Sequence, residues 1–103
     1  MNKGEFIDRL SDTANLTKKE ARQLLDSVLD LISDSLQHGE DVKLVGFGKF
    51  GVRARRASSR INPQTKKPIQ VDAKVVPLFK PGKELKRLVE KNLKVTEKGV
   101  ARK

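Results

Sequence analysis

The stretch TKKEARQLLDSVLDLISDSLQHG, residues 17–39, decides how the rest of the chain must fold. Thr17 and Glu20 have the spacing of a capping box, in which each side chain accepts a hydrogen bond from the other residue's backbone amide. This pair predicts the start of a helix. Gly39 predicts the end of that helix directly after His38.

Apolar side chains occupy a wide arc of this helix, roughly 160° at 100° per residue. The arc consists of Ala21, Leu24, Leu25, Val28, Leu29, Leu31, Ile32 and Leu36. Asp26, Asp30 and Asp34 stand on the opposite side. The remaining chain supplies little apolar surface to cover the arc, so we expect the helix to pack on its own chain and on a second subunit. A helix buried in the core of a monomer is the alternative.

The composition excludes several classes of protein. A chain of 103 residues provides for one domain. It has no cysteine and one histidine, His38, so we expect no enzyme, no metal site, no cofactor and no small-molecule substrate. No apolar run is long enough to span a membrane or to serve as a signal peptide, so we expect a soluble intracellular protein.

The charge is divided unevenly along the chain. Residues 1–41 carry five Lys or Arg against nine Asp or Glu, whereas residues 42–103 carry eighteen against four. This asymmetry indicates a surface that meets a polyanion, most commonly a nucleic acid. An anionic membrane is the runner-up. The polar faces of the helices are acidic or mixed rather than rich in lysine, so we expect no membrane binding.

Two more elements are expected in the first half of the chain. Apolar spacing predicts a short amphipathic helix over residues 3–14, before a break at Asn15 and Leu16. Alternating apolar residues then predict a hairpin with strands at residues 42–44 and 50–54, on either side of Gly46-Phe47-Gly48.

The second half is expected to contain further strands and one helix. Apolar and polar residues alternate again over residues 69–75, with the apolar ones at odd positions. Val76 and Leu78 then fall at even positions, which predicts a bulge or bend near Val75. Pro77 fits an edge strand because it has no amide hydrogen. A last helix is expected to start near Pro81-Gly82. The lysine-rich tail from Asn92 is expected to fray or to be disordered.

Residues 53–83 form the most basic part of the chain, with nine Lys or Arg and a single acid, Asp72. Within it, residues 57–68 contain only one large apolar side chain, Ile61, and cannot fold around a core of their own. We therefore expect a protruding β-ribbon. A solvated loop whose charges keep the protein soluble is the alternative, although solubility rarely needs so one-sided a charge.

The aromatic residues favour duplex DNA as the partner of this ribbon. Single-strand binders stack bases on exposed aromatic side chains, but this chain has no Trp or Tyr, and its four Phe lie in apolar patterns. Arginines on an extended ribbon suit the narrow minor groove. Asn62-Pro63-Gln64-Thr65 is the expected tip, where the rigid, flat ring of Pro63 would part a base step. An ordinary turn is the alternative interpretation of Asn-Pro.

Several segments together resemble the HU and integration host factor family of bacterial nucleoid proteins, and its HU branch in particular. They are Met1-Asn2-Lys3, Leu16-Thr17-Lys18-Lys19, Gly46-Phe47-Gly48-Lys49-Phe50, Val52-Arg53 with Arg55, Asn62-Pro63-Gln64-Thr65, and Phe79-Lys80-Pro81-Gly82-Lys83. The resemblance covers residues 1–91 and implies an α+β fold. That fold is an intertwined dimer with two N-terminal helices, a three-stranded antiparallel sheet, a long protruding β-arm at about residues 53–76 and a short C-terminal helix. Residues 92–103 would be a flexible basic tail.

The resemblance also implies a function. It implies a histone-like protein of the bacterial cytoplasm and nucleoid that binds double-stranded DNA through the minor groove with little sequence specificity. The tip proline would intercalate and bend the DNA, and the protein partner would be a second copy or a paralogue. The residues expected to contact DNA are Lys3, Arg53, Arg55, Arg56, Arg60, Ile61, Asn62, Pro63, Gln64, Thr65, Lys66, Lys67, Lys74, Lys80, Lys83 and Lys86. The resemblance also implies an exposed ion pair between Lys3 and Asp26, which would add under about 1 kcal/mol to stability.

The tip departs from the family pattern in two places. Arg60-Ile61 stands where the family usually has a glycine and a basic residue, and Lys66 stands where it usually has a glycine. The tip is therefore expected to turn differently, and Ile61 either adds to the wedge or packs along the arm. Two other functions remain as alternatives: a sequence-specific subunit of the integration host factor type, and a protein that binds double-stranded RNA.

Overall fold

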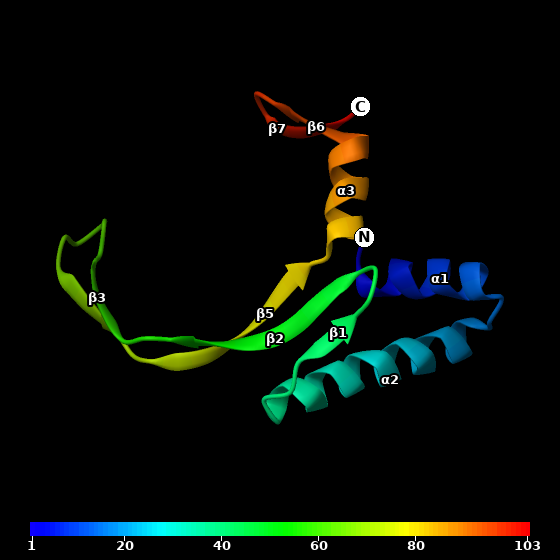
Figure 1. Cartoon of the computed structure of the whole chain (residues 1–103), viewed down its shortest axis with the longest axis horizontal. Helices are drawn as coiled ribbons and strands as arrows, with labels where there is room; N and C mark the ends of the chain where they lie inside the picture. The colour runs from blue at the N-terminus through cyan, green and yellow to red at the C-terminus, as the bar shows by residue number, and fades with distance from the viewer. The chain divides into compact units, whose positions relative to one another are not determined.

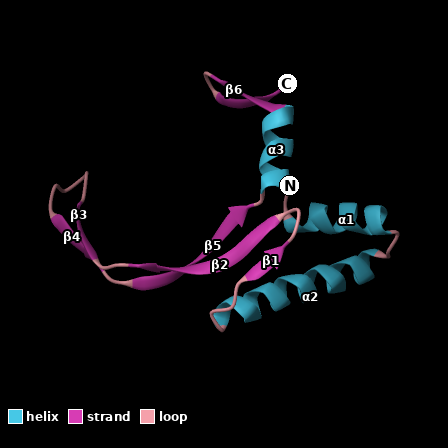
Figure 2. Cartoon of the chain, in the orientation of Figure 1, coloured by secondary structure: helices cyan, strands magenta, loops and turns pink.

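The computed structural model describes all 103 residues and contains three helices and seven strands. They follow one another in the order α1, α2, β1, β2, β3, β4, β5, α3, β6 and β7 (Figure 1). The chain divides into two compact units, residues 1–38 and residues 39–103. The first unit consists of helices alone, and the second contains all of the strands (Figure 2). The predicted mixture of helices and antiparallel strands is confirmed.

Side-chain caps define the two helices of the N-terminal unit. The helix α1 spans Lys3–Ala14 and begins where the Asn2 side chain accepts a hydrogen bond from the Glu5 amide at 2.9 Å. The helix α2 spans Lys18–Gln37. The predicted capping box is present: the Glu20 amide donates to Thr17 Oγ1 at 3.1 Å, and the Thr17 amide donates to Glu20 Oε1 at 3.0 Å. The hydrogen bond from the Thr17 amide, and to a lesser extent the Thr17 hydroxyl, lowers the pKa of the Glu20 carboxyl below its usual value, because both favour its charged form.

The two helices bury very little apolar surface between them. Ile7 and Ala21 are the only buried apolar side chains, and Ser11 beside them donates to the Asp8 carbonyl at 2.8 Å. Much of the apolar arc of α2 stays open to solvent, and Leu31 is 69% exposed. The alternative of a helix buried in a monomer core is therefore wrong. Packing requires a further apolar surface to cover this helix.

The predicted hairpin and a third strand form an antiparallel sheet in the order β1-β2-β5. Its strands are β1 at Val42–Leu44, β2 at Gly48–Arg55 and β5 at Lys74–Pro81. Pro77 lies on the edge strand β5, as predicted. The Phe79 ring lies 4.8 Å from the Phe50 ring and 5.5 Å from the Phe47 ring, measured between centroids. Gly48 must be a glycine, since a Cβ there would come within 2.6 Å of the Phe79 ring.

Beyond this sheet, the strands β3 (Ser58–Ile61) and β4 (Pro68–Val71) pair with each other alone. The predicted bulge near Val75 is wrong, because the β2–β5 ladder runs unbroken from Gly48–Pro81 to Arg55–Lys74. Residues 56–57 and 72–73 are unpaired, and pairing resumes where Ser58 lies opposite Val71. Each strand leaves two residues unpaired, so the register is the same on both sides of this break. Val76 and Leu78 change the parity of the apolar pattern because they lie on the opposite face of β5 from Val75, Pro77 and Phe79, with no extra residue inserted.

The C-terminal elements are a helix and an unexpected hairpin. The helix α3 spans Lys83–Asn92, close to its predicted start, and the Gly82 amide at its N-cap donates to the Phe47 carbonyl at 2.9 Å. The strands β6 (Leu93–Thr96) and β7 (Gly99–Arg102) then pair antiparallel. The expectation of an unstructured tail is wrong in this respect, since Gly99 adopts a φ of 122° and closes a tight turn. None of the three helices is long and apolar enough to cross a membrane.

Candidate nucleic-acid interface

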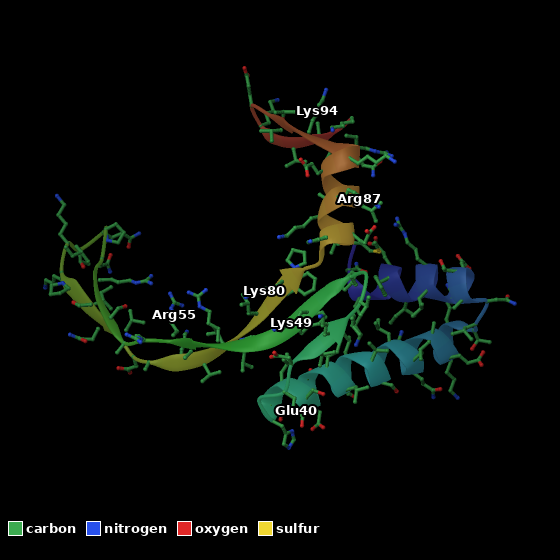
Figure 3. All side chains as sticks on the ribbon, viewed as in Figure 1. Glu40, Lys49, Arg55, Lys80, Arg87 and Lys94 are labelled. Carbon is green, nitrogen blue, oxygen red and sulfur yellow. The ribbon has the colours of Figure 1, made fainter.

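The sheet of the C-terminal unit has one cationic and one apolar face. Successive side chains of a strand point to opposite faces, and directly paired residues share a face. The pairs Phe50–Phe79, Val52–Pro77 and Ala54–Val75 therefore make up the apolar face. The pairs Lys49–Lys80, Gly51–Leu78, Arg53–Val76 and Arg55–Lys74 make up the other. Figure 3 labels Lys49, Arg55 and Lys80 on these strands.

Four of the predicted arginines lie together where the ladder breaks. Arg53, Arg55, Arg56 and Arg60 line an open hollow of about 640 Å³, together with Val76 and Leu78 among others. All four arginines are exposed, and no carboxylate pairs with any of them. Their guanidinium groups are free to donate hydrogen bonds to an anion.

The tip turn, residues 62–67, is held by hydrogen bonds to Asn62. Its side-chain oxygen accepts from the Gln64 amide at 2.8 Å and from the Thr65 amide at 3.4 Å. Its backbone amide donates to the Lys67 carbonyl at 2.9 Å, and its carbonyl accepts from the Lys66 amide at 2.7 Å. Pro63 follows Asn62 directly and is exposed. A short amide side chain that binds the next backbone amides is the reason that Asn-Pro makes a stable turn here.

Lys66 keeps the backbone conformation that a glycine would adopt without strain. Its φ is 58°, in the left-handed region, and Asn15 is the only other non-glycine residue with a positive φ. This conformation costs a residue with a Cβ about 1 kcal/mol. The turn therefore accepts a lysine at its left-handed position, and it presents one more exposed cation beside Pro63.

Ile61 is not packed along the arm. Its side chain is 72% exposed, and its partner across the β3–β4 ladder is Pro68, which is also exposed. Ile61 and Pro68 share a face of the ribbon and lie at the base of the tip turn. An exposed isoleucine here adds apolar surface next to Pro63, so the interpretation of Ile61 as an arm-packing residue is wrong.

The other expected site residues lie at several places in the fold. Gln64, Thr65 and Lys67 lie in the tip turn, and Lys74 and Lys80 lie on β5. Lys83 and Lys86 lie in the first turns of α3. Lys3 belongs to the N-terminal unit, where its Nζ lies 2.8 Å from Asp26 Oδ1, so the implied ion pair is present.

Two cations of the sheet, Lys43 and Lys49, are paired with each other and were not among the predicted site residues. Lys49 shares the cationic face with Lys80, its partner across the ladder, and its Nζ lies 3.2 Å from Asp41 Oδ2. The signal for it was its parity, because Lys49 alternates in step with Arg53 and Arg55.

Comparison with known proteins shows the family to which this chain belongs. A sequence model of the family described as "Bacterial DNA-binding protein" matches residues 1–90. The chain belongs to that family. Among its relatives, DNA-binding protein HU of Thermotoga maritima is 47% identical to it over 90 residues, which are 87% of this chain and 100% of the relative. DNA-binding protein HU of Staphylococcus aureus (strain COL) is 49% identical over 90 residues, again 87% of this chain and 100% of the relative.

Solved structures of this family share the fold. A cocrystal structure of Anabaena HU with DNA matches with a TM-score of 0.79 at 39% identity, and the match covers 85% of this chain and 96% of that one. HU from Thermotoga maritima matches with a TM-score of 0.62 at 38% identity, covering 85% of this chain and 97% of that one. The identification of the chain with the HU and integration host factor family is confirmed.

Proposed function

We propose that this chain is a histone-like protein that binds double-stranded DNA through the minor groove, with little sequence specificity, and bends it. The observation that carries the proposal is the cationic face of the sheet, which leads into the hollow lined by Arg53, Arg55, Arg56 and Arg60. A strip of unpaired guanidinium groups fits the closely spaced phosphates and the electronegative minor groove of a duplex. Membership of the family and the match to the Anabaena HU–DNA cocrystal support the same partner.

The contact set consists of the arm, its tip and the body of the C-terminal unit, together with Lys3. Arm arginines enter the groove, and Lys74, Lys80, Lys83 and Lys86 neutralise phosphates. Because phosphate contacts carry no sequence information, binding of this kind is largely nonspecific. Such a protein works in the nucleoid of the bacterial cytoplasm, as a binding protein and not as a catalyst.

The bend comes from the tip. Pro63 is exposed in a turn that Asn62 holds closed, and Ile61 adds an exposed apolar side chain next to it. Apolar side chains inserted between base pairs part the stack and kink the duplex toward the major groove. We assign the intercalating role to Pro63, with Ile61 extending the wedge.

The protein acts as an intertwined dimer of two identical chains. The support is the open apolar arc of α2, in which Leu31 is 69% exposed although its sequence pattern is that of a core helix. A second copy supplies the same apolar surface and so covers the first. A heterodimer with a paralogue would use the same surface.

Binding and bending are tested together on short duplexes. We expect affinities for linear, nicked and cruciform DNA that fall steeply with salt, as counterion release requires, and a sharp bend measured by fluorescence energy transfer between the DNA ends. The variant Pro63→Ala should bend DNA much less and lose little affinity, with Gln64→Ala as the control at the neighbouring position. A sharp bend in the presence of Pro63→Ala would reject the wedge.

The same titrations discriminate the alternative functions. Preference for one defined DNA site over random sequence would indicate a subunit of the integration host factor type. Equal or tighter binding to double-stranded RNA would indicate an RNA-binding protein instead. We expect neither, because phosphate contacts carry no sequence information and exposed arginines suit the narrow minor groove of duplex DNA.

A further inference from the structure

The C-terminal hairpin, residues 93–102, lies outside the part of the chain that the family accounts for. The family match ends at residue 90, and an alignment over 90 residues uses the whole Thermotoga maritima relative. The hairpin is nevertheless an ordered part of the fold. It pairs from Leu93–Arg102 to Thr96–Gly99, and the Lys103 amide donates to the Asn92 carbonyl at 3.0 Å, which joins its base to the end of α3.

The charge of this hairpin and of the residue that follows it is strongly positive. Four cations, Lys94, Lys98, Arg102 and Lys103, stand against one acid, Glu97, and none of these five side chains forms an ion pair. Residues 1–92 already carry nineteen Lys or Arg against twelve Asp or Glu, so solubility gives no reason for three more net positive charges here. An arrangement of unpaired cations on a β-hairpin resembles the arm of the same protein.

One face of the hairpin carries exposed apolar side chains beside the cation Arg102. Val95 and Val100 pair directly, and they are 91% and 67% exposed. The arm has the same combination of features, with Ile61 opposite Pro68 next to its cations. Exposed apolar side chains can lie against the sugars of a groove, while the cations that flank them bind the phosphates.

We propose that the C-terminal hairpin is a second DNA-binding element, which contacts the phosphate backbone beyond the segment held by the sheet and the arm. The inference rests on the proposed function. The ten residues of α3 span about 15 Å, and Lys83 and Lys86 lie at their beginning. The hairpin starts at the other end of this helix. Its cations therefore lie a helix length away from Lys83 and would contact other phosphates than Lys83 and Lys86 do.

The charges are tested in the full-length chain. The variant Lys94→Gln/Lys98→Gln/Arg102→Gln/Lys103→Gln keeps the length of the side chains. We expect it to reduce the slope of log affinity against log salt by about one for each cation lost, and to shorten the footprint by several base pairs. The matched control Arg9→Gln/Lys18→Gln/Lys19→Gln/Arg22→Gln removes the same charge from the N-terminal unit. It should leave the length of the footprint unchanged.

Proximity is tested with a single cysteine, because the natural chain has none. Lys98→Cys at the turn of the hairpin is labelled with an iron chelate that cleaves nearby DNA. We expect cuts outside the footprint of the quadruple variant, and no cuts from the same label at Asp30→Cys on the acidic side of α2. Absence of cuts from position 98 would overturn the proposal.

The outcomes separate this inference from the proposed function. If the parent chain fails to bind duplex DNA, the proposed function fails. If the quadruple variant binds and bends DNA with the slope and footprint of the parent, only the hairpin proposal fails. A changed sedimentation coefficient without DNA, together with an unchanged slope, would make the hairpin a contact between proteins and would also overturn the proposal.

Discussion

The two units of this chain differ in what their exposed side chains can bind. The helical unit, residues 1–38, presents uncovered apolar side chains and an acidic face. The sheet unit, residues 39–103, presents unpaired cations on one face and at its tip. Apolar surface is a signature of association between proteins, whereas unpaired cations attract a polyanion.

This difference assigns association between subunits to the first part of the sequence and DNA binding mainly to the second part. The helical unit has capping hydrogen bonds at both helix starts, and it buries only Ile7, Ser11 and Ala21. The arm has neither a core nor extensive contacts with other elements, since β3 and β4 pair only with each other. A change in the first unit should therefore act on assembly, and a change in the arm should act on DNA affinity.

The largest effect is expected from a charge on the apolar arc of α2. Leu31→Asp would bury an unpaired carboxylate between two subunits, which costs several kcal/mol. Because so small a core does not stabilise a lone chain, we expect loss of the dimer and of helical structure together. Sedimentation and circular dichroism at several protein concentrations measure both. Asp30→Asn, on the acidic side, should change neither, and a fully associated Leu31→Asp would contradict assembly through this face.

The next largest effect is expected on DNA affinity. Arg53→Ala/Arg55→Ala/Arg60→Ala should weaken binding about a hundredfold or more at moderate salt, and by similar factors for all sequences, because phosphate and groove contacts are lost. Assembly should be unaffected. Titrations of three unrelated duplexes, with sedimentation of the free protein, measure the two properties. A dimer that dissociates in this variant would undermine the division of roles between the units.

A smaller effect is expected at the tip. Lys66→Gly and Lys66→Asn both suit a left-handed backbone, so they should preserve the bend and lower the salt slope by about one. Lys66→Val cannot adopt this conformation without strain, and it should reduce the bend as well. Energy transfer across the DNA measures the bend. An equally sharp bend with all three variants would show that the conformation of residue 66 does not matter.

The smallest effect concerns the helical unit and depends on pH. The lowered pKa of Glu20 means that the unfolded chain takes up a proton at a higher pH than the folded chain. The stabilisation is therefore complete above the unfolded pKa and is lost as the pH falls through the folded pKa. Glu20→Gln keeps a capping side chain and should remove this component of the acid dependence, whereas Thr17→Ala should cost about 1 kcal/mol at neutral pH. Urea unfolding from pH 7 to pH 3 compares them.

Local patterns were sufficient to predict the helices and the central sheet. The capping box of Thr17 and Glu20, the alternation around Gly46-Phe47-Gly48 and the Pro81-Gly82 signal depend on neighbours within a few residues. For the same reason, simple parity was sufficient to place Arg53 and Arg55 on one face of the sheet, whereas their role in binding stays a prediction.

The errors arose where pairing between distant residues decides the structure. The change of parity after Val75 has the same sequence signature for a bulge as for apolar residues on both faces of a regular strand, and only the partner strand distinguishes them. The hairpin at residues 93–102 was not predicted, because its lysines suggested disorder. Leu93 and Val95 nevertheless alternate with polar residues, and Val100 lies opposite Val95. The exposure of Ile61 depends on the absence of a covering element, which local sequence does not report.

The gap in the ladder at residues 56–57 and 72–73 has a consequence for degradation. Arg55 and Arg56 provide two adjacent trypsin sites, and both are exposed at the point where strand pairing stops. Proteases need an extended, accessible segment, and unpaired residues open more readily than paired strands. Chains without a nucleic-acid partner would therefore be clipped at this point first, while bound chains are shielded.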